Sequence, residues 1–452
     1  MAYGSRGRRP IERASKSAHH HVINDEAVVN LVSQSWLPPA HDAVELPPGI
    51  VIPSLGTEPP VEHFIAIDGS YQEAVVRPEY PSSTLCFMQF GAVAFSREDL
   101  LSVDRSPHPA PEDMERLRNL ERLKLAFPLR NMRLAEATSL TESIRQSVYQ
   151  FFNGAVLSGL PLMDTLKWFI FREFESSTSG GRVWHLASNP CTPDREGIDL
   201  RLSDMRPDYS FVCARTNRPI YLTDVFRLHE RIDEHLGAGG ILGYLTTTVE
   251  QLIVVHILRL IARRRPAALS NIAIIKDGPL AFFGVTANLH APMRDLLTHL
   301  SRTAQPNLIG VEKSGPFVEH AHQIRDRMQP GQALILNDAY IYRNILASGS
   351  ADDSGRSYGA STYYGRKVIF KTRTNAVHVL TIPTNIETAD PRVENFFGFE
   401  KALQTTDLLH CDMYDDALFP VALANKLVSL SAHPSQRILE RFATHSIRTG
   451  TS

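Results

Sequence analysis

The stretch HFIAIDGSYQ at residues 63–72 is an apolar run that breaks on an acid, a glycine and a serine. A second stretch, NIAIIKDGPL at residues 271–280, repeats that order. Small and β-branched residues bounded by turn formers are typical of strands, so we predict strands that end on Asp68 and Asp277. Strand ends of an α/β sheet are where loops build sites, and the following glycine allows close approach by a ligand. If the two strands are neighbours, their carboxylates converge.

Strand-like and helix-like patterns alternate along the rest of the chain, which indicates an α/β protein. Runs rich in β-branched residues predict further strands at 84–96, 307–313, 333–337, 367–372 and 377–383. Helical periodicity predicts helices at 113–126, 133–152, 162–175, 244–264 and 419–429. Because the last two strands follow each other closely, we expect them to pair antiparallel within a mixed sheet flanked by helices.

The distribution of patterned and unpatterned sequence divides the chain into four parts. Residues 1–60 begin basic and unpatterned and continue rich in proline, which is typical of a tail and an irregular lead-in. Residues 61–176 and 241–452 carry the strand and helix patterns and are assigned to two parts of one core. Residues 177–240, loose and rich in Pro, Gly and Asp, are assigned to an insertion between them.

Composition disfavours several classes of protein. A net charge of −2 gives no basic field over the whole chain, so nucleic-acid contacts require a local cluster of Lys and Arg. Four cysteines are too few for a disulfide framework, and no apolar stretch approaches the ~20 residues of a membrane helix, so we expect a cytoplasmic protein. The positions of Cys191, Cys213, His229 and His235 lack paired CxxC spacing, which favours a metal-free insertion over a zinc site.

The two strand-end acids indicate a cation site. Converging carboxylates repel each other unless a proton or a cation lies between them, and oxygen ligands of this kind favour Mg²⁺ or Mn²⁺. A pair of such metals activates water and stabilises the leaving oxygen in phosphodiester cleavage. The alternative is that each acid merely starts a turn, since Asp-Gly is a common turn dipeptide.

A third acid would complete the site, and the sequence offers two. Glu250 lies near the start of the predicted helix that leads into the strand of Asp277, and Glu136 is a rival. A structural alternative for Glu250 is a first-turn glutamate that stabilises the helix N-terminus.

Cationic and aromatic residues gather in YYGRKVIFKTR at 363–373. Phosphate contacts combined with base stacking would suit single-stranded DNA, although an ordinary charged sheet edge explains the pattern equally well. The candidate DNA-binding residues are Tyr363, Tyr364, Arg366, Lys367, Lys371 and Arg373.

Four motifs in this order resemble those of the NurA nucleases: AIDGSYQ at 66–72, IIKDGPL at 274–280, LIGVEKSG at 308–315 and DALFPVALANKLVSLS at 416–431. The resemblance covers about residues 61–431, with more chain between the two Asp-Gly motifs than compact members carry. It implies an RNase H-like fold, manganese-dependent cleavage of DNA ends, a homodimer and a HerA-type hexameric ATPase as partner. End resection in DNA repair and defence against foreign DNA are both compatible with it.

Carried over motif by motif, the resemblance assigns the two family aspartates to Asp68 and Asp277 and the family glutamate to Glu250. The lysine of the third motif is Lys313, whose ammonium would hold the scissile phosphate or stabilise developing negative charge.

The fourth motif departs from the family pattern, which usually has a histidine where this chain has Asn425. An amide oxygen can ligate a metal but cannot act as a titrating base. Asp416, on the preceding turn, is an alternative fourth ligand. The missing histidine also favours a second function, that of a catalytically weak adaptor that binds DNA ends for an ATPase ring.

Overall fold

The computed structural model describes residues 25–35, 50–57, 60–102, 120–175, 182–346, 357–410 and 418–428. The chain divides into two compact units, Met1–Glu45 and Leu46–Ser452. In the first unit the described element is helix α2 (Glu26–Gln34), which begins after Asp25, whose carboxylate accepts a hydrogen bond from the amide of Ala27. This helix lies in a stretch that we predicted to be irregular.

The second unit contains, within the described residues, a nine-stranded mixed sheet in the order β1-β13-β14-β15-β12-β11-β2-β3-β4. Its strands are β1 (Ile50–Val51), β2 (His63–Arg77), β3 (Ser83–Ser96), β4 (Leu120–Arg130), β11 (Ile272–Asp277), β12 (Asn307–Glu312), β13 (Ala333–Ile335), β14 (Gly365–Lys371) and β15 (Val377–Pro383). Strands β2, β3 and β4 form an antiparallel meander, whereas β11 is parallel to both β2 and β12. The predicted α/β class is confirmed, as is the antiparallel pairing of β14 with β15.

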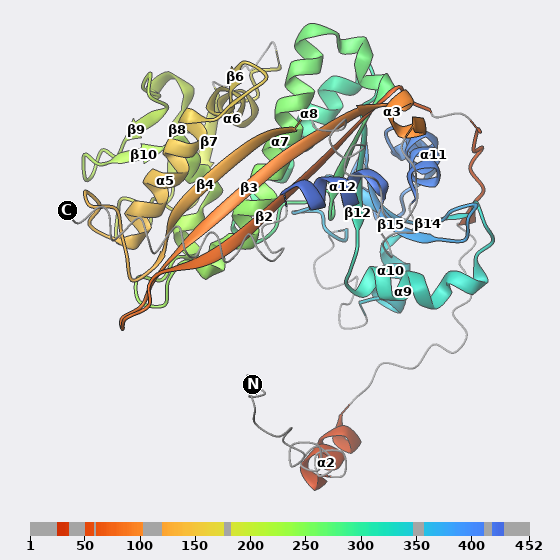
Figure 1. Cartoon of the computed structure of the whole chain (residues 1–452), viewed down its shortest axis with the longest axis horizontal. Coiled ribbons are helices and arrows are strands. Elements are labelled where there is room, and N and C mark those ends of the chain that lie inside the picture. The colour runs from red at the N-terminus through yellow and green to blue at the C-terminus, as the bar shows by residue number, and fades with distance from the viewer. Residues whose placement is uncertain are drawn as a thin grey trace. The chain divides into compact units, whose positions relative to one another are not determined.

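Strand β2 does not end on its acid as we predicted. It runs on to Arg77 because β3 pairs with it along nearly its whole length. On its other side, β11 accompanies only the first part of β2, and the last pair is Ile67 with Lys276. Asp68 is therefore the residue at which β2 loses one neighbour, and Figure 1 shows β2, β3 and β4 extending beyond the rest of the sheet.

The predicted helix at 113–126 is wrong over its described part, because residues from Leu120 form strand β4. Its sequence LERLKLAFPLR alternates with a period of two, and the alternate residues Leu123, Leu125, Phe127 and Leu129 are buried. Pairing with β3 thus overrides the helix propensity of the Glu, Arg and Lys residues between them.

The helices of the second unit cover both faces of the sheet. They are α3 (Arg97–Ser102), α5 (Leu140–Gly154), α6 (Leu162–Ile170), α7 (Leu242–Arg264), α8 (His290–Ser301), α9 (Pro316–Ile324), α10 (Asp338–Asn344), α11 (Phe399–Leu409) and α12 (Phe419–Val428). The predicted helices at 133–152, 162–175, 244–264 and 419–429 correspond to α5, α6, α7 and α12, each with shifted ends.

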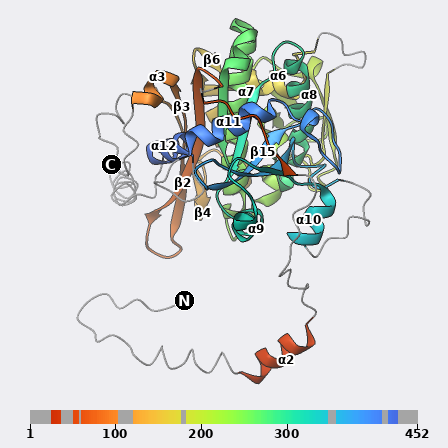
Figure 2. The same ribbon diagram turned by 90° about the vertical axis from the view of Figure 1, so that its right-hand side faces the viewer.

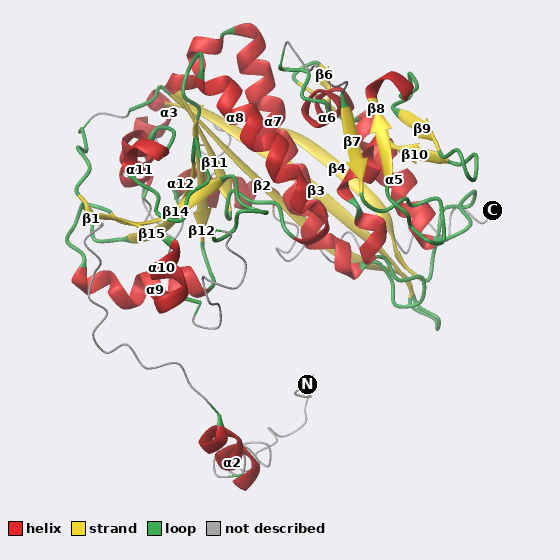
Figure 3. Ribbon diagram, turned by 180° about the vertical axis from the view of Figure 1, so that it is seen from behind, coloured by secondary structure: helices red, strands yellow, loops and turns green. Residues whose placement is uncertain are grey.

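Two hydrophobic clusters form the core. Neighbouring residues of one strand belong to different clusters, as Ile67 and Ala66 do on β2 and Ile274 and Ile275 do on β11. Because successive side chains of a strand point to opposite faces, the clusters lie on opposite sides of the sheet. Helices α5 to α8 contribute to the first cluster, on the face seen in Figure 3. Helices α11 and α12, drawn in blue in Figure 2, contribute to the second.

Helix α7 is buried on nearly all sides, as expected for a helix that is apolar around its circumference. It ends before Pro266, which cannot continue a helix. Contrary to our expectation, Gly239–Arg264 is long and apolar enough to cross a membrane by length and composition, and among the described residues it is the one such helix. Since 72% of its most apolar 18-residue stretch is buried inside the protein, the same pattern fits a core helix.

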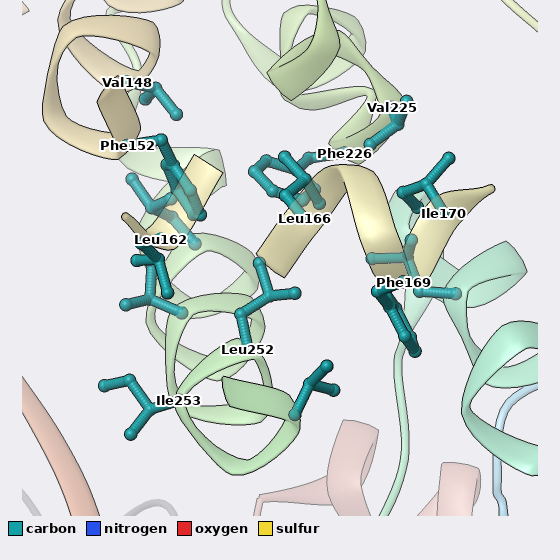
Figure 4. Packing of buried hydrophobic residues seen from close by; sticks show 14 of the residues in the cluster. Val148, Phe152, Leu162, Leu166, Phe169, Ile170, Val225, Phe226, Leu252 and Ile253 are labelled. Atoms are coloured by element: carbon teal, nitrogen blue, oxygen red, sulfur yellow. The ribbon is translucent and has the colours of Figure 1, made fainter. Parts of the chain in front are cut away.

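The segment assigned as an insertion forms short hairpins that pack on α5, α6 and α7. The strands of this segment are β7 (Val183–Leu186), β8 (Ile198–Arg201), β9 (Ser210–Val212) and β10 (Pro219–Tyr221). The two-residue strands β5 (Val156–Leu157) and β6 (Leu160–Pro161) precede it, between α5 and α6. Figure 4 shows Val225 and Phe226 of this segment beside Leu166 of α6, in the same cluster as Leu252 of α7. The hydrophobic cluster that supports α7 therefore continues into this segment.

Candidate active site

One pocket of about 430 Å³ brings together Asp68, Glu250, Asp277 and Lys313, four of the residues singled out in the sequence. It lies where β11 ends and β2 runs on, beside α7. The remaining lining residues are Gly69, Thr247, Lys276, Gly278, Pro279, Phe283, Glu312 and Ser314.

Asp68 is a buried carboxylate in a crowded acidic site. Its side chain shares a face of β2 with Ala66, two residues earlier, and its Oδ1 accepts a hydrogen bond of 2.8 Å from the amide of Gly69. Burial raises the pKa of Asp68 to about 7, and the nearby charges of Asp277 and Glu250 act in the same direction. A carboxyl pKa is raised in this way where several carboxylates lie close together and away from water.

Asp277 is the last residue of β11, as the sequence predicted. The chain then turns sharply through Gly278, whose φ of 79° favours glycine and whose amide donates to the carbonyl of Val311 at 2.7 Å. Lys313 follows the end of the parallel neighbour β12, and its ammonium donates to Oδ2 of Asp277 at 2.8 Å. The parallel pairing of β11 with β12 thus places this acid and this lysine side by side.

Glu250 reaches the pocket from the third turn of α7, which begins at Leu242. It is therefore not a first-turn residue that stabilises the helix N-terminus. The absence of a side chain at Gly69 makes room for it, because a Cβ there would lie 3.1 Å from Oε1 of Glu250 and 2.7 Å from the ring of Phe90. Burial raises the pKa of Glu250, although Lys276 opposes the shift. The rival Glu136 is exposed and does not line the pocket.

Sequence reasoning missed two further charged residues of the pocket. Lys276 is buried and donates to the backbone oxygen of Asp277, and its ammonium lies 2.8 Å from Oε2 of Glu250. Glu312 pairs with the buried Lys367 of β14. A charged residue inside an otherwise apolar strand was the available signal for both, since a buried charge requires a partner.

Carboxylate oxygens are the type of ligand that a hard divalent cation prefers. Asp68, Glu250 and Asp277 line one pocket, and their mutual repulsion is what a cation would relieve. Across the part of the chain that the structure describes, however, no group of three or more His, Cys, Asp or Glu side chains is arranged to hold a metal ion. Two of the three acids are instead paired with ammonium groups, Glu250 with Lys276 and Asp277 with Lys313.

The candidates for a fourth ligand lie in or near α12. This helix packs on the face of the sheet to which Asp68 belongs, since Val421 and Ala424 share a cluster with Ala66. Asn425 is exposed on α12 and does not line the pocket. Asp416 lies outside the described residues.

The predicted DNA-binding stretch is not a basic surface. Strand β14 lies between β13 and β15 rather than at an edge. Arg366 pairs with Asp338, Lys367 pairs with Glu312, and the ammonium of Lys371 donates to two backbone oxygens.

Both tyrosines of that stretch are also buried, and the hydroxyl of Tyr364 donates to Gln251 of α7. Tyr363 packs beneath Phe283 of the pocket, with ring centroids 5.6 Å apart. Arg373 keeps a half-exposed side chain but pairs with Asp407. The expected exposed interface is therefore not found, because Arg366, Lys367 and Arg373 pair with acids from other elements and Lys371 donates to backbone oxygens.

Comparison with known proteins gives distant neighbours. No family model matches the chain, and no curated protein matches it. The solved structure of the NurA nuclease from Sulfolobus solfataricus is similar, with 9% identity and a TM-score of 0.33 over 97% of this chain and 98% of that chain. A NurA structure with manganese follows, with 12% identity and a TM-score of 0.27 over 95% and 96% of the two chains. A NurA structure bound to dAMP and manganese has 13% identity and a TM-score of 0.26 over 94% of each.

These TM-scores are too low for the likeness to carry an argument about the pocket. All three neighbours are NurA structures, the family that the sequence motifs resemble.

Proposed function

We propose that this chain is a divalent-metal-dependent DNA nuclease of the NurA type. The observation that carries the proposal is the gathering of Asp68, Glu250, Asp277 and Lys313 in one pocket, from two strands, a helix and the turn after β12. Carboxylates that repel one another beside lysines are the chemistry that phosphodiester hydrolysis with bound metals requires.

Five charged residues of the pocket have a role in this proposal. Asp68, Glu250 and Asp277 would hold Mn²⁺ or Mg²⁺, which when bound would supply an activated water and stabilise the leaving oxygen. Lys313, whose side chain is 28% exposed, turns from Asp277 toward a phosphate of the substrate and stabilises its negative charge. Lys276 stays buried and holds the carboxylate of Glu250 in place.

The proposal is tested by incubating the purified chain with end-labelled single-stranded and duplex DNA. Shortened products should form with Mn²⁺ or Mg²⁺ and disappear when EDTA is added. Intact DNA under all metal conditions would reject the nuclease proposal.

A paired substitution tests the choice of the third ligand. Glu250→Gln should weaken Mn²⁺ binding and abolish cleavage, because a neutral amide binds a hard cation less tightly than a carboxylate. The exposed Glu136→Gln is the matched control and should change neither. Isothermal titration with Mn²⁺ and a cleavage assay measure both effects, and urea unfolding checks that each variant is folded. The opposite result would transfer the role to Glu136.

Two observations favour the alternative proposal of a catalytically weak adaptor that binds DNA ends. The carboxylates of Glu250 and Asp277 are neutralised by lysines, and the described residues include no ready group of metal ligands. An adaptor would bind DNA ends with the same affinity in Mn²⁺ and in EDTA and would release no nucleotides.

A motor partner is the second part of the proposal. The sequence contains no GxxxxGK[ST] motif, and a net charge of −2 gives little non-specific attraction to DNA, so translocation has to be supplied by another protein. We propose that a cytoplasmic homodimer docks on a HerA-like hexameric ATPase, in end resection or in defence against foreign DNA.

The motor should raise the rate of long-duplex degradation only when it hydrolyses ATP. The measurement compares the loss of duplex DNA by the chain together with a HerA-like ATPase, in ATP and in a non-hydrolysable analogue, with a short single strand as control. Equal rates of duplex degradation with ATP and with the analogue, or the lack of a stable complex, would exclude a mechanism in which the ATPase feeds DNA to the nuclease.

A further inference from the structure

Phe283 is the one aromatic side chain among the described residues that line the pocket. It is 37% exposed, whereas the preceding Phe282 is fully buried in the core beside Tyr364. The other described lining residues are charged, hydroxyl-bearing, glycine or proline. A large apolar ring thus faces solvent inside a polar pocket, and a ligand that covered it would gain the free energy of burying apolar surface.

The backbone and the ring of Phe283 each have a fixed neighbour. The backbone carbonyl oxygen of Phe283 accepts hydrogen bonds from Thr286, from the amide at 3.1 Å and from the hydroxyl at 2.9 Å. The ring packs edge-to-face on Tyr363 with an interplanar angle of 85°, and Ala281 pairs with Tyr363 through the backbone. A ring fixed in this way loses little conformational freedom when a ligand binds, so it is a preorganised contact surface.

The groups around Phe283 define what can lie on it. The acids of the pocket disfavour an anionic ligand portion at the ring itself, while Lys313, 28% exposed and paired with Asp277, is the cation that would turn to a phosphate. A nucleobase is neutral and planar and stacks on aromatic side chains whatever its identity. A volume of about 430 Å³ is in the range of pockets that take one small ligand, which here corresponds to a single nucleotide.

We infer that Phe283 is the platform on which the nucleobase beside the scissile phosphate stacks. Both faces of a base in an intact duplex are already covered by its neighbours, so a base must leave the stack before it can lie on the ring. This inference rests on the proposed nuclease function and adds a residue that positions the substrate in the site.

The test combines a protein variant with a substrate variant. Phe283→Ala removes the ring, and an oligonucleotide with one abasic position at the cleaved end removes the base. Each change alone should lower kcat/KM on single-stranded DNA roughly 5- to 150-fold, mainly through KM, which is the range for loss of one stacked base. Together they should lower it no further than one alone, because both remove the same contact.

Three further variants make the result specific. Phe283→Tyr should retain activity because it keeps the ring, whereas Phe283→Leu keeps apolar volume without a π-face and should behave like Phe283→Ala. Tyr80→Ala is the control, because this tyrosine is 97% exposed and lies outside the pocket. It should not change kcat/KM, and thermal unfolding confirms that the four variants are folded.

The outcomes separate the two proposals. Suppose that the wild type cuts DNA but the losses of kcat/KM from Phe283→Ala and from the abasic position multiply, or that Phe283→Ala has no effect. The stacking platform is then rejected while the nuclease proposal stands. If Phe283→Leu retains full activity, packing explains the ring and stacking is rejected. If the wild type cuts no DNA in any metal, the nuclease proposal and the platform that rests on it both fall.

Discussion

Asp68→Asn and Asp277→Asn should each lower the Mn²⁺-dependent rate of DNA cleavage roughly 10³-fold, which corresponds to about 4 kcal/mol of lost transition-state stabilisation. An amide keeps the size of the side chain but removes the charge that binds the cation. The two aspartates directly follow Ile67 and Lys276, the last pair of β2 and β11, and line one pocket, so both substitutions act on the same site. Initial rates on end-labelled single-stranded DNA measure the effect.

The double variant provides the sharper result. If both acids serve one metal site, the double substitution should be hardly slower than either single one, because residues that act as a unit are not additive. Asp199→Asn is the matched control, an aspartate on strand β8 that is half exposed and outside the pocket. Near wild-type activity in either single variant would contradict the metal site.

Asp68→Asn, which should lower the rate of cleavage, should raise the free energy of unfolding of the metal-free protein. The pKa of Asp68 is about 7 in the folded chain, above its ordinary value of 3.8. An acid with a raised pKa binds its proton more tightly when folded, so the free energy of unfolding is highest below about pH 4 and falls as the pH rises to about 7. At pH 8 the ionised carboxylate destabilises the fold by an amount on the order of 4 kcal/mol.

Asp68→Asn should therefore be more stable than the wild type at pH 8 in EDTA and nearly equal to it at pH 4. Urea unfolding at a series of pH values measures the difference. Added Mn²⁺ should stabilise the wild type more than the variant, because a ligand that binds only the folded state adds its binding free energy. A variant that is less stable than the wild type at pH 8 would show that the charge of Asp68 is already compensated.

The strand and Asp-Gly patterns located the centre of the pocket from sequence. Strands that end together in a sheet bring their following residues together, and this rule predicted the position of Asp277, beside which the structure places Lys313. It also placed Asp68 there, for a partly different reason, since β2 does not end but outruns its neighbour β11. A pattern of apolar residues cannot show how long each neighbour of a strand is.

Charged residues were the part that sequence predicted least well. The cations of 365–371 are typical of a charged, exposed strand, and only the fold reveals that Glu312 and Asp338 from other elements meet Lys367 and Arg366 inside the protein. Lys276 was passed over for the same reason, because its partner Glu250 is on α7. Ion pairs between different strands and helices form only in the tertiary structure, so the periodicity of the residues within one element does not predict them.

The parallel pairing of β2 with β11 has a consequence for synthesis on the ribosome. His63 pairs with Ile272, so about 200 residues must be added before β2 can meet this partner, which takes roughly 10–40 s at 5–20 residues per second. During this interval the meander of β2, β3 and β4 can form alone, because its contacts are local in sequence. Asp68 then has neither Glu250 nor Asp277 beside it. The nascent chain is thus without its acidic pocket until the second half of the protein has emerged.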